Sequence, residues 1–247
     1  MKLSVLIPAH NEEENIHQTV EALYKELMAS QIDHEIVVIN DNSSDMTEET
    51  LINMRQSIQT LRYYNNTYPN GFGFAVRYGF EKITGECVAI MMADASDSPK
   101  DLTFFFRKLA EGYDAVFGSR FISGGKVIDY PIHKLILNRI ANNFIRLVFG
   151  ISYNDTTNAF KLYRSNCLRR LEPYLSNHFI LTVELPLKVI VRGYSYAILP
   201  NSWENRKTGK SKLKIKEMGS RYLFIVLYCL IEKYFSSGDY RKKQNYT

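Results

Sequence analysis

The chain has 247 residues, of which 45% are hydrophobic and 23% are charged. This composition excludes a disordered chain and suits one large folded domain or two small ones. The net charge of +5 is too small to indicate nucleic-acid binding by itself. The three cysteines, Cys87, Cys167 and Cys229, are far apart and odd in number. They therefore indicate neither a metal site nor a disulfide framework, and they suit a reducing, cytosolic setting.

Strands and helices are expected to alternate through the first half of the chain. Short apolar runs predict strands at residues 2–7, 35–39, 61–64, 87–92 and 114–117. Four helices are expected between these strands. The first begins at a capping box at Asn11, the second spans residues 47–58, the third runs from a glycine turn at 70–73 to residue 83, and the fourth spans residues 102–110. This alternation predicts a doubly wound, mostly parallel α/β sheet with right-handed crossovers.

Three polar loops, residues 8–12, 40–45 and 94–97, each follow one of these strands. The carboxyl ends of parallel strands share one edge of the sheet, and ligands bind there in open α/β folds. Asp94 and Asp97 on the third loop can hold a hard divalent cation through oxygen. Asp97 can alternatively cap the helix that starts near Pro99, whereas Asp94 lies too early in the chain for that role.

The second half of the chain is less regular. A flexible hinge is expected at residues 123–125, and a helix at 133–149 carries Lys134, Arg139 and Arg146 among apolar residues. Residues 155–164 indicate a polar turn that runs into a strand, residues 181–191 a helix with a buried Glu184, and residues 195–199 a last strand. Residues 206–216 contain six cations and no acid.

Residues 222–231 carry no charge, but the stretch is far shorter than the ~20 apolar residues of a spanning helix. Aromatic side chains and flanking cations favour a helix that lies in the membrane interface: Tyr222, Phe224, Tyr228, Tyr234 and Phe235, with Arg221, Lys233 and Arg241. The alternatives are a helix docked on the protein's own core and a dimer contact. We expect a catalytic domain at residues 1–217 and an interfacial helix with a basic tail at 218–247.

Seven stretches in a fixed order carry a resemblance to a known family. They are VLIPAHNE (5–12), VINDNS (38–43), NGFG (70–73), AD (93–94), GSR (118–120), DTTNAFKLYR (155–164) and RKTGKSK (206–212). Together they resemble the family-two glycosyltransferases of the GT-A (Rossmann-like) fold, and within these the dolichol-phosphate mannose synthase-like branch. The resemblance covers residues 5 to about 212.

This resemblance implies an inverting transfer from a nucleotide sugar to a polyprenyl phosphate, with Mg²⁺ or Mn²⁺ as cofactor. It places Pro8, His10, Glu12 and Asp41 around the nucleoside, and Asp94 at the diphosphate through the cation. Asp97 is an extra acid relative to the family pattern, and its place on the same loop makes it the expected second ligand of the cation. Arg120 and Arg139 fall where the family grips the acceptor phosphate and are expected to act in catalysis with Asp94, and Arg206 and Lys212 fall in the basic loop that closes over the sugar-phosphate end. Lys134, on the same expected helix as Arg139, is added to the acceptor-side residues. The chain departs from the usual Asp-Ala-Asp pattern, because Met92 replaces the first aspartate and Ser96 a later glutamine.

A phosphate acceptor is already ionised at neutral pH, so it needs positioning and charge neutralisation rather than a strong base. A sugar hydroxyl would need a carboxylate base, and Asp155 and Glu184 are the candidates, each with a structural alternative. The rival functions are therefore an enzyme that elongates a lipid-linked glycan or surface polysaccharide, and a nucleotide-sugar-binding scaffold.

The expected partners are a nucleotide sugar, a polyprenyl phosphate and the membrane surface, at the cytoplasmic face. A homo-oligomer or a membrane-protein partner stays open. Nucleic acid is not expected, because no aromatic residues are interleaved with the basic run 206–216.

Overall fold

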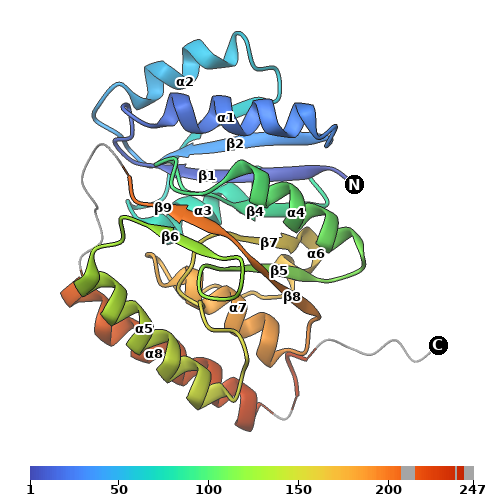
Figure 1. The fold of residues 1–247 in the computed structure, drawn as a ribbon, viewed down its shortest axis with the longest axis vertical. Helices are drawn as coiled ribbons and strands as arrows, with labels where there is room; N and C mark the ends of the chain where they lie inside the picture. Colours follow the sequence, from blue (N-terminus) through green and yellow to red (C-terminus); the bar gives the residue numbers. More distant parts are fainter. Residues whose placement is uncertain (207–214, 237, 242–247) are drawn as a thin grey trace.

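The computed structural model describes residues 1–206, 215–236 and 238–241, and it confirms the alternating α/β fold (Figure 1). The strands are β1 (Leu3–Ala9), β2 (His34–Asn40), β3 (Leu61–Asn65), β4 (Cys87–Ile90), β5 (Ala115–Ser119), β6 (Lys126–Ile128), β7 (Lys161–Arg164), β8 (Tyr196–Pro200) and β9 (Ser202–Glu204). The helices are α1 (Ile16–Ala29), α2 (Thr47–Arg55), α3 (Phe72–Phe80), α4 (Pro99–Ala110), α5 (Ile132–Phe149), α6 (Ser165–Arg169), α7 (Leu181–Val191) and α8 (Ile215–Phe235).

The main sheet has seven strands in the order β3-β2-β1-β4-β7-β5-β8. All its neighbours run parallel except β7, which is antiparallel to both β4 and β5. A strand at the end of residues 155–164 is confirmed, and it lies between β4 and β5.

Both faces of the sheet are covered by helices, as a doubly wound fold requires. Successive residues of β1 alternate between the two faces. Val5 and Ile7 pack in one core with α1, α2 and α4, whereas Leu6 packs in the other core with α3, α6 and α7. Helix α1 turns one apolar face toward the sheet, since Ile16, Val20, Leu23 and Leu27 are buried.

The expected capping box at Asn11 is wrong. Helix α1 begins only at Ile16, and its N-cap Asn15 makes no side-chain capping bond. Asn11 takes a left-handed conformation with φ 50°, and its side-chain oxygen accepts from the Ser44 backbone N–H at 2.7 Å. The asparagine therefore joins the first two polar loops instead of starting the helix.

The expected hinge at residues 123–125 is a tight turn. The Gly125 N–H donates to Ile122 O at 2.9 Å, and a Cβ on Gly125 would lie 2.7 Å from Ser119 O. The turn leads into β6, which pairs with β9 in a separate two-stranded ribbon that the apolar pattern does not reveal. Tertiary contact between segments about 75 residues apart forms this ribbon, so local sequence carries no signal for it.

Helices α5 and α8 lie side by side at one end of the molecule (Figure 1). Ile225, Val226 and Cys229 of α8 are buried in a third core with residues of α5 and α7. Helix α8 is thus docked on the body, and the expected domain boundary at 217/218 falls inside it. Within the described residues, no helix combines the length and apolar character needed to cross a bilayer.

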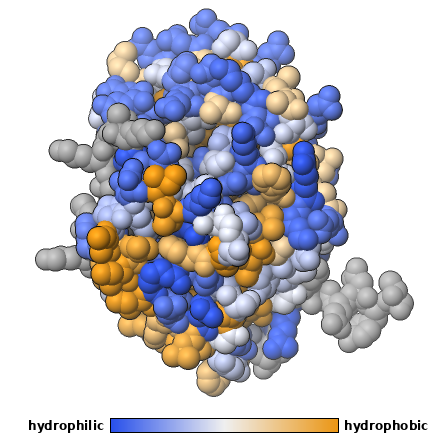
Figure 2. Space-filling model, in the orientation of Figure 1, coloured by the Kyte–Doolittle hydropathy of each residue, from blue (hydrophilic) through white to orange (hydrophobic). Residues whose placement is uncertain are grey.

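The outer sides of α5 and α8 are apolar and exposed, and Figure 2 shows hydrophobic side chains gathered over both helices. We use the term apolar face for Ile132, Ile136, Leu137, Ile140, Phe144 and Leu147 of α5 with Leu223, Phe224, Leu227, Ile231, Tyr234 and Phe235 of α8. Tyr222 and Tyr228, also expected as interfacial aromatics, pack against the third core instead. A contiguous exposed apolar patch of this kind is typical of a surface that binds a protein or a membrane.

Candidate active site

The three polar loops meet at the carboxyl edge of the sheet, as predicted. The Asn11 N–H donates to the Ser43 hydroxyl at 2.9 Å, which joins the first loop to the second. Thr19 of α1 donates to Ala93 O at 2.9 Å, which joins the first helix to the third loop. Parallel pairing of β1 with both β2 and β4 puts the three strand ends in one row.

Asp94 and Asp97 are both largely buried in the third loop. Asp94 Oδ1 accepts from the Ser96 N–H at 3.2 Å, and Asp97 Oδ2 accepts from the Met92 N–H at 3.2 Å. Burial, together with the nearby charge of Asp94, raises the pKa of Asp97 to about 7. The Ser96 hydroxyl is buried between them and makes no hydrogen bond to the described residues.

These groups fit a divalent cation bound partly by a substrate. No group of three or more His, Cys, Asp or Glu side chains in the described part of the chain is arranged to hold a metal. Mg²⁺, however, is usually held by one or two carboxylates together with substrate phosphates and water. Asp94 and Asp97 supply the two carboxylates of such a site, and the backbone N–H of Met92 holds Asp97 in place by a hydrogen bond.

Arg206, which follows β9, contacts the loop of Asp94 and Asp97, which we call the carboxylate loop. Its Nη2 donates to Asp94 Oδ2 at 2.7 Å, and its Nη1 lies 3.3 Å from Glu12 Oε1. The resemblance places Arg206 in the basic loop on the acceptor side of the site. In the structure, Arg206 instead contacts Asp94 and Glu12, two acids expected on the donor side. Lys212, the other expected residue of that loop, lies outside the described residues.

The four residues expected around the nucleoside are brought together at the ends of β1 and β2. Pro8 is paired in register with Ile39, and the Asp41 N–H donates to Ala9 O at 2.7 Å. His10 Nδ1 lies 2.7 Å from Asp41 O, and Glu12 accepts from the Asn15 side chain at 3.0 Å. The two oxygens of Asp41 accept from the Asn66 side chain and the Gly71 N–H, which braces the glycine turn.

The glycine turn makes a close approach to the loop before α7. A Cβ on Gly73 would lie 2.5 Å from the Asn177 carbonyl carbon and 2.7 Å from the His178 nitrogen. Any side chain at this position would force the two segments apart, so only glycine fits. The turn therefore fixes the donor end of the site to the second half of the chain.

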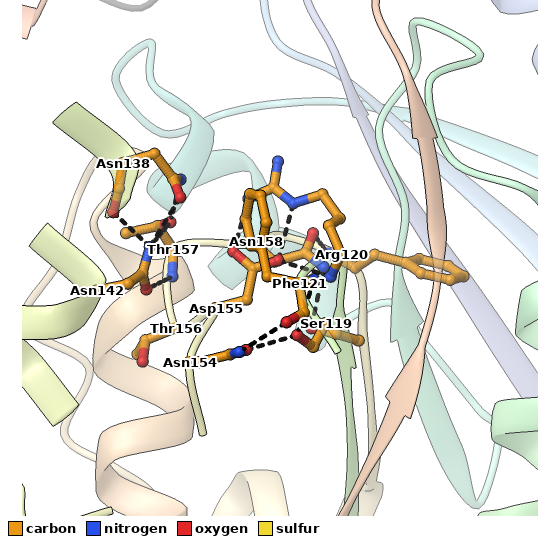
Figure 3. Close-up of polar contacts among 12 residues, drawn as sticks. Ser119, Arg120, Phe121, Asn138, Asn142, Asn154, Asp155, Thr156, Thr157 and Asn158 are labelled. Atoms are coloured by element: carbon orange, nitrogen blue, oxygen red, sulfur yellow. Dashed lines mark hydrogen bonds and ion pairs between the residues drawn. The ribbon is translucent and has the colours of Figure 1, made fainter. Parts of the chain in front are cut away.

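Arg120 follows β5 and forms a buried ion pair with Asp155 (Figure 3). Its Nε and Nη2 donate to the two carboxylate oxygens at 2.8 and 2.7 Å, and the side chains are 7% and 0% exposed. Burial opposes the charge on Arg120, but the charge and hydrogen bonds of Asp155 outweigh it and raise its pKa. Asp155 is thus held as a structural partner, which removes it as a general base.

Arg139 on α5 lies close to Arg120 through a shared aromatic ring. The two guanidinium carbons are 4.2 Å and 5.4 Å from the Phe121 ring centroid, and Arg139 Nη1 donates to Asn154 O at 2.9 Å. Burial and the charges of Arg120 and Arg146 lower the pKa of Arg139, although Asp155 opposes them. Two neighbouring cations of this kind attract an anion.

Two further predicted residues lie away from this cluster. Lys134 is on α5, two residues after its first residue, and is partly exposed. Glu184 is fully buried, accepts from the Leu175 and Ser176 N–H groups at 2.8 and 2.7 Å, and pairs with Lys188 at 2.6 Å. Glu184 is therefore a buried, ion-paired glutamate with a structural role, and it does not serve as a base.

Trp203 belongs to the site but was missed from the sequence. Its backbone forms a β-bridge with Asp97, and its ring lies 4.8 Å from the Tyr130 ring and 5.9 Å from the Arg120 guanidinium. It therefore stands between the carboxylate loop and the two arginines. The chain contains a single tryptophan, and this was the one signal that could have drawn attention to it.

Known proteins share the sequence pattern and the fold of this chain. Residues 4–172 match the glycosyl transferase family 2 domain. Polyprenol monophosphomannose synthase of Mycolicibacterium smegmatis is 26% identical over 220 residues, which cover 85% of this chain and 80% of that one. Dolichol-phosphate mannosyltransferase of Pyrococcus furiosus is 28% identical over 220 residues, or 87% of this chain and 60% of that longer protein.

Solved structures of glucosyl-3-phosphoglycerate synthase from Mycobacterium tuberculosis share the fold. The complex with Mn²⁺, UDP-glucose and phosphoglyceric acid superposes with a TM-score of 0.70 at 17% identity, and it covers 93% of this chain and 79% of that one. The complex with Mg²⁺ and UDP gives a TM-score of 0.67. The matched domain spans more than half of the 247 residues, and the chain therefore belongs to glycosyl transferase family 2 and is a glycosyltransferase.

Proposed function

We propose that this glycosyltransferase moves a sugar, with inversion, from a nucleotide sugar to a polyprenyl phosphate at the cytoplasmic surface of a membrane. The names of the two relatives support a polyprenyl acceptor, and the UDP complexes of the structural neighbours support a nucleotide-sugar donor. The three cysteines are free and buried, in keeping with a reducing compartment.

The observation that carries the proposal is that one helix bears both an acceptor arginine and half of the apolar face. Arg139 projects from α5 toward Arg120, while Ile136, Ile140 and Leu147 of the same helix are exposed. The charged residues of α5 are all basic, and on α8 Glu232 is buried in an ion pair with Arg192. An apolar surface edged by cations suits an anionic bilayer, from which only the phosphate of a polyprenyl lipid projects.

The state of the carboxylates favours a phosphate over a hydroxyl acceptor. Asp155 and Glu184, the two candidate bases, are fully buried and held in ion pairs. A phosphate oxygen needs no base to attack the anomeric carbon. The new C–O bond then forms as the bond to the diphosphate breaks, and the nucleoside diphosphate leaves with that electron pair.

In this scheme the chain's own residues position the attacking phosphate and neutralise the negative charge of the reacting groups. Arg120 and Arg139 orient the attacking phosphate, and the Asp155 pair keeps Arg120 in place. Asp94 and Asp97 would hold Mg²⁺ or Mn²⁺, which offsets the charge that develops on the leaving diphosphate.

The proposal is tested with a panel of nucleotide sugars against polyprenyl phosphates of several lengths and against glycan acceptors with free hydroxyl groups. We expect transfer to the phosphate lipids and none to the glycans. Transfer only to a glycan would favour the elongating enzyme, and binding without any turnover would favour a scaffold.

Arg139→Ala should weaken the use of polyprenyl phosphate and leave donor binding nearly unchanged. Losing one charge-assisted contact costs about 1.5–3 kcal/mol, or roughly 10- to 100-fold in kcat/KM for the acceptor. Calorimetry with the donor alone is the control. A comparable loss of donor affinity would move Arg139 to the donor side.

Phe224→Glu should reduce activity on long-chain acceptor in anionic liposomes at least about tenfold, because it puts a carboxylate on the apolar face. Activity on a short, soluble acceptor should persist. Phe104→Glu on α4 is a matched control, since the two phenylalanines are 60% and 57% exposed. Equal liposome co-sedimentation of both variants would show that the apolar face meets protein rather than lipid.

A further inference from the structure

Arg206 and a divalent cation would need the same atom of this site. Arg206 Nη2 lies 2.7 Å from Asp94 Oδ2, the carboxylate we assign to the cation, and Nη2 also lies 3.4 Å from Glu12 Oε1. The side chain of Arg206 is 14% exposed and those of the two acids are 9% exposed. A guanidinium and a metal ion cannot both occupy this oxygen, and their charges repel each other in so buried a place.

The backbone before Arg206 is fixed at several points. The Ser202 N–H donates to Asp101 Oδ2 at 2.7 Å, the Glu204 N–H to Ser96 O at 3.0 Å, and the Asn205 N–H to Ile128 O at 3.0 Å. Strand β9 is thereby attached to the carboxylate loop itself. The contact of Arg206 with Asp94 follows from this attachment, and rotation of the side chain alone is enough to break it.

We propose that Arg206 is a built-in counter-ion that neutralises Asp94 and Glu12 until a divalent cation and a nucleoside diphosphate arrive together. The cation takes over Asp94, and the displaced guanidinium finds a new anion in the diphosphate. A cation alone would displace Arg206 from Asp94 without supplying the diphosphate, so that the contacts of Arg206 with Glu12 at 3.3 and 3.4 Å would remain but the lost carboxylate would not be replaced. Direct contact of the cation with the diphosphate already couples the binding of the two ligands, and the release of Arg206 from Asp94 adds a further positive coupling. The inference rests on the cation role of Asp94 in the proposed function.

The test measures binding of Mn²⁺ by calorimetry, without and with UDP or GDP, and involves no turnover. For the wild type we expect weak binding of Mn²⁺ alone and binding at least about tenfold tighter with the matching nucleoside diphosphate. Arg206→Gln should bind Mn²⁺ alone about tenfold more tightly than the wild type, so the gain in Mn²⁺ affinity on adding the nucleotide should be smaller than in the wild type by about the same factor. Arg206→Lys keeps the charge but loses the planar fork, so it should fall between them.

Arg62→Gln is the control for the general effect of losing one positive charge. Arg62 lies 3.5 Å from Glu35, at the opposite edge of the sheet, and its loss should change Mn²⁺ affinity by less than about twofold. Equal Mn²⁺ affinity of the wild type and both Arg206 variants would overturn the counter-ion role and leave the cation site intact. Absence of Mn²⁺ binding in every variant, even with UDP or GDP, would overturn the cation site itself.

Discussion

Asp94→Asn is expected to reduce sugar transfer at least about 100-fold while the protein stays folded. A neutral amide is a poor ligand for a hard cation, so the charge of the leaving diphosphate would lose its counter-ion. The side-chain oxygen of asparagine can still accept from the Ser96 N–H, which bonds Asp94 at 3.2 Å. The loop is therefore expected to keep its shape.

Initial rates over a range of Mn²⁺ concentrations check this expectation, with circular dichroism as the test of folding. Asp97→Asn should have a weaker effect, because burial raises the pKa of Asp97 to about 7 and so reduces the negative charge it carries near neutral pH. Asp114→Asn is the matched control, since Asp114 bonds Ser195 beside the amino end of β5, far from the loop. Near wild-type transfer by Asp94→Asn at limiting Mn²⁺ would place the cation elsewhere.

Asp155→Asn is expected to lower the free energy of unfolding by about 3–5 kcal/mol. The substitution leaves the positive charge of Arg120 buried, with the 2.7 and 2.8 Å contacts to Asp155 weakened. An isolated buried charge loses its hydration without compensation. Acceptor use should fall as well, since Arg120 and Arg139 share the Phe121 ring and the loop that Asp155 fixes.

Denaturant unfolding measures this loss, and Glu111→Gln serves as its control. Glu111 pairs with Lys108 at the surface at 2.7 Å, and such pairs contribute only about 0–1 kcal/mol. The double variant Arg120→Gln/Asp155→Asn removes both charges and should recover part of the stability. A loss below about 1 kcal/mol for Asp155→Asn would mean that water reaches Arg120 and that the pair is not a buried one.

The role of Arg120 was predicted only in part. A basic residue after β5 could be placed at the carboxyl edge of the sheet from its position in the sequence. Its pairing with Asp155, 35 residues later, could not, because it depends on a loop that folds back before β7. The same loop holds Arg139 through Asn154, so one tertiary arrangement positions both arginines.

By itself, the sequence determined the features that depend on short stretches of residues and on the alternation of strands with helices. Apolar runs such as residues 87–90 specify buried strands, and strands that alternate with helices specify a parallel sheet with its loops at one edge. The position of Asp94 at that edge was therefore predictable, because it depends only on which strand precedes it. The short-range periodicities of 2 and 3.6 residues carry this information.

Only the tertiary structure decided where distant segments meet. The antiparallel insertion of β7 between β4 and β5, the β6–β9 ribbon, and the docking of α8 on α7 all join parts of the chain that are not neighbours in sequence. The contact of Arg206 with Asp94 spans 112 residues and has no local pattern at either end. Such contacts depend on the summed packing of the whole chain, because each pairing is stabilised only once the surrounding elements have excluded water and fixed its geometry.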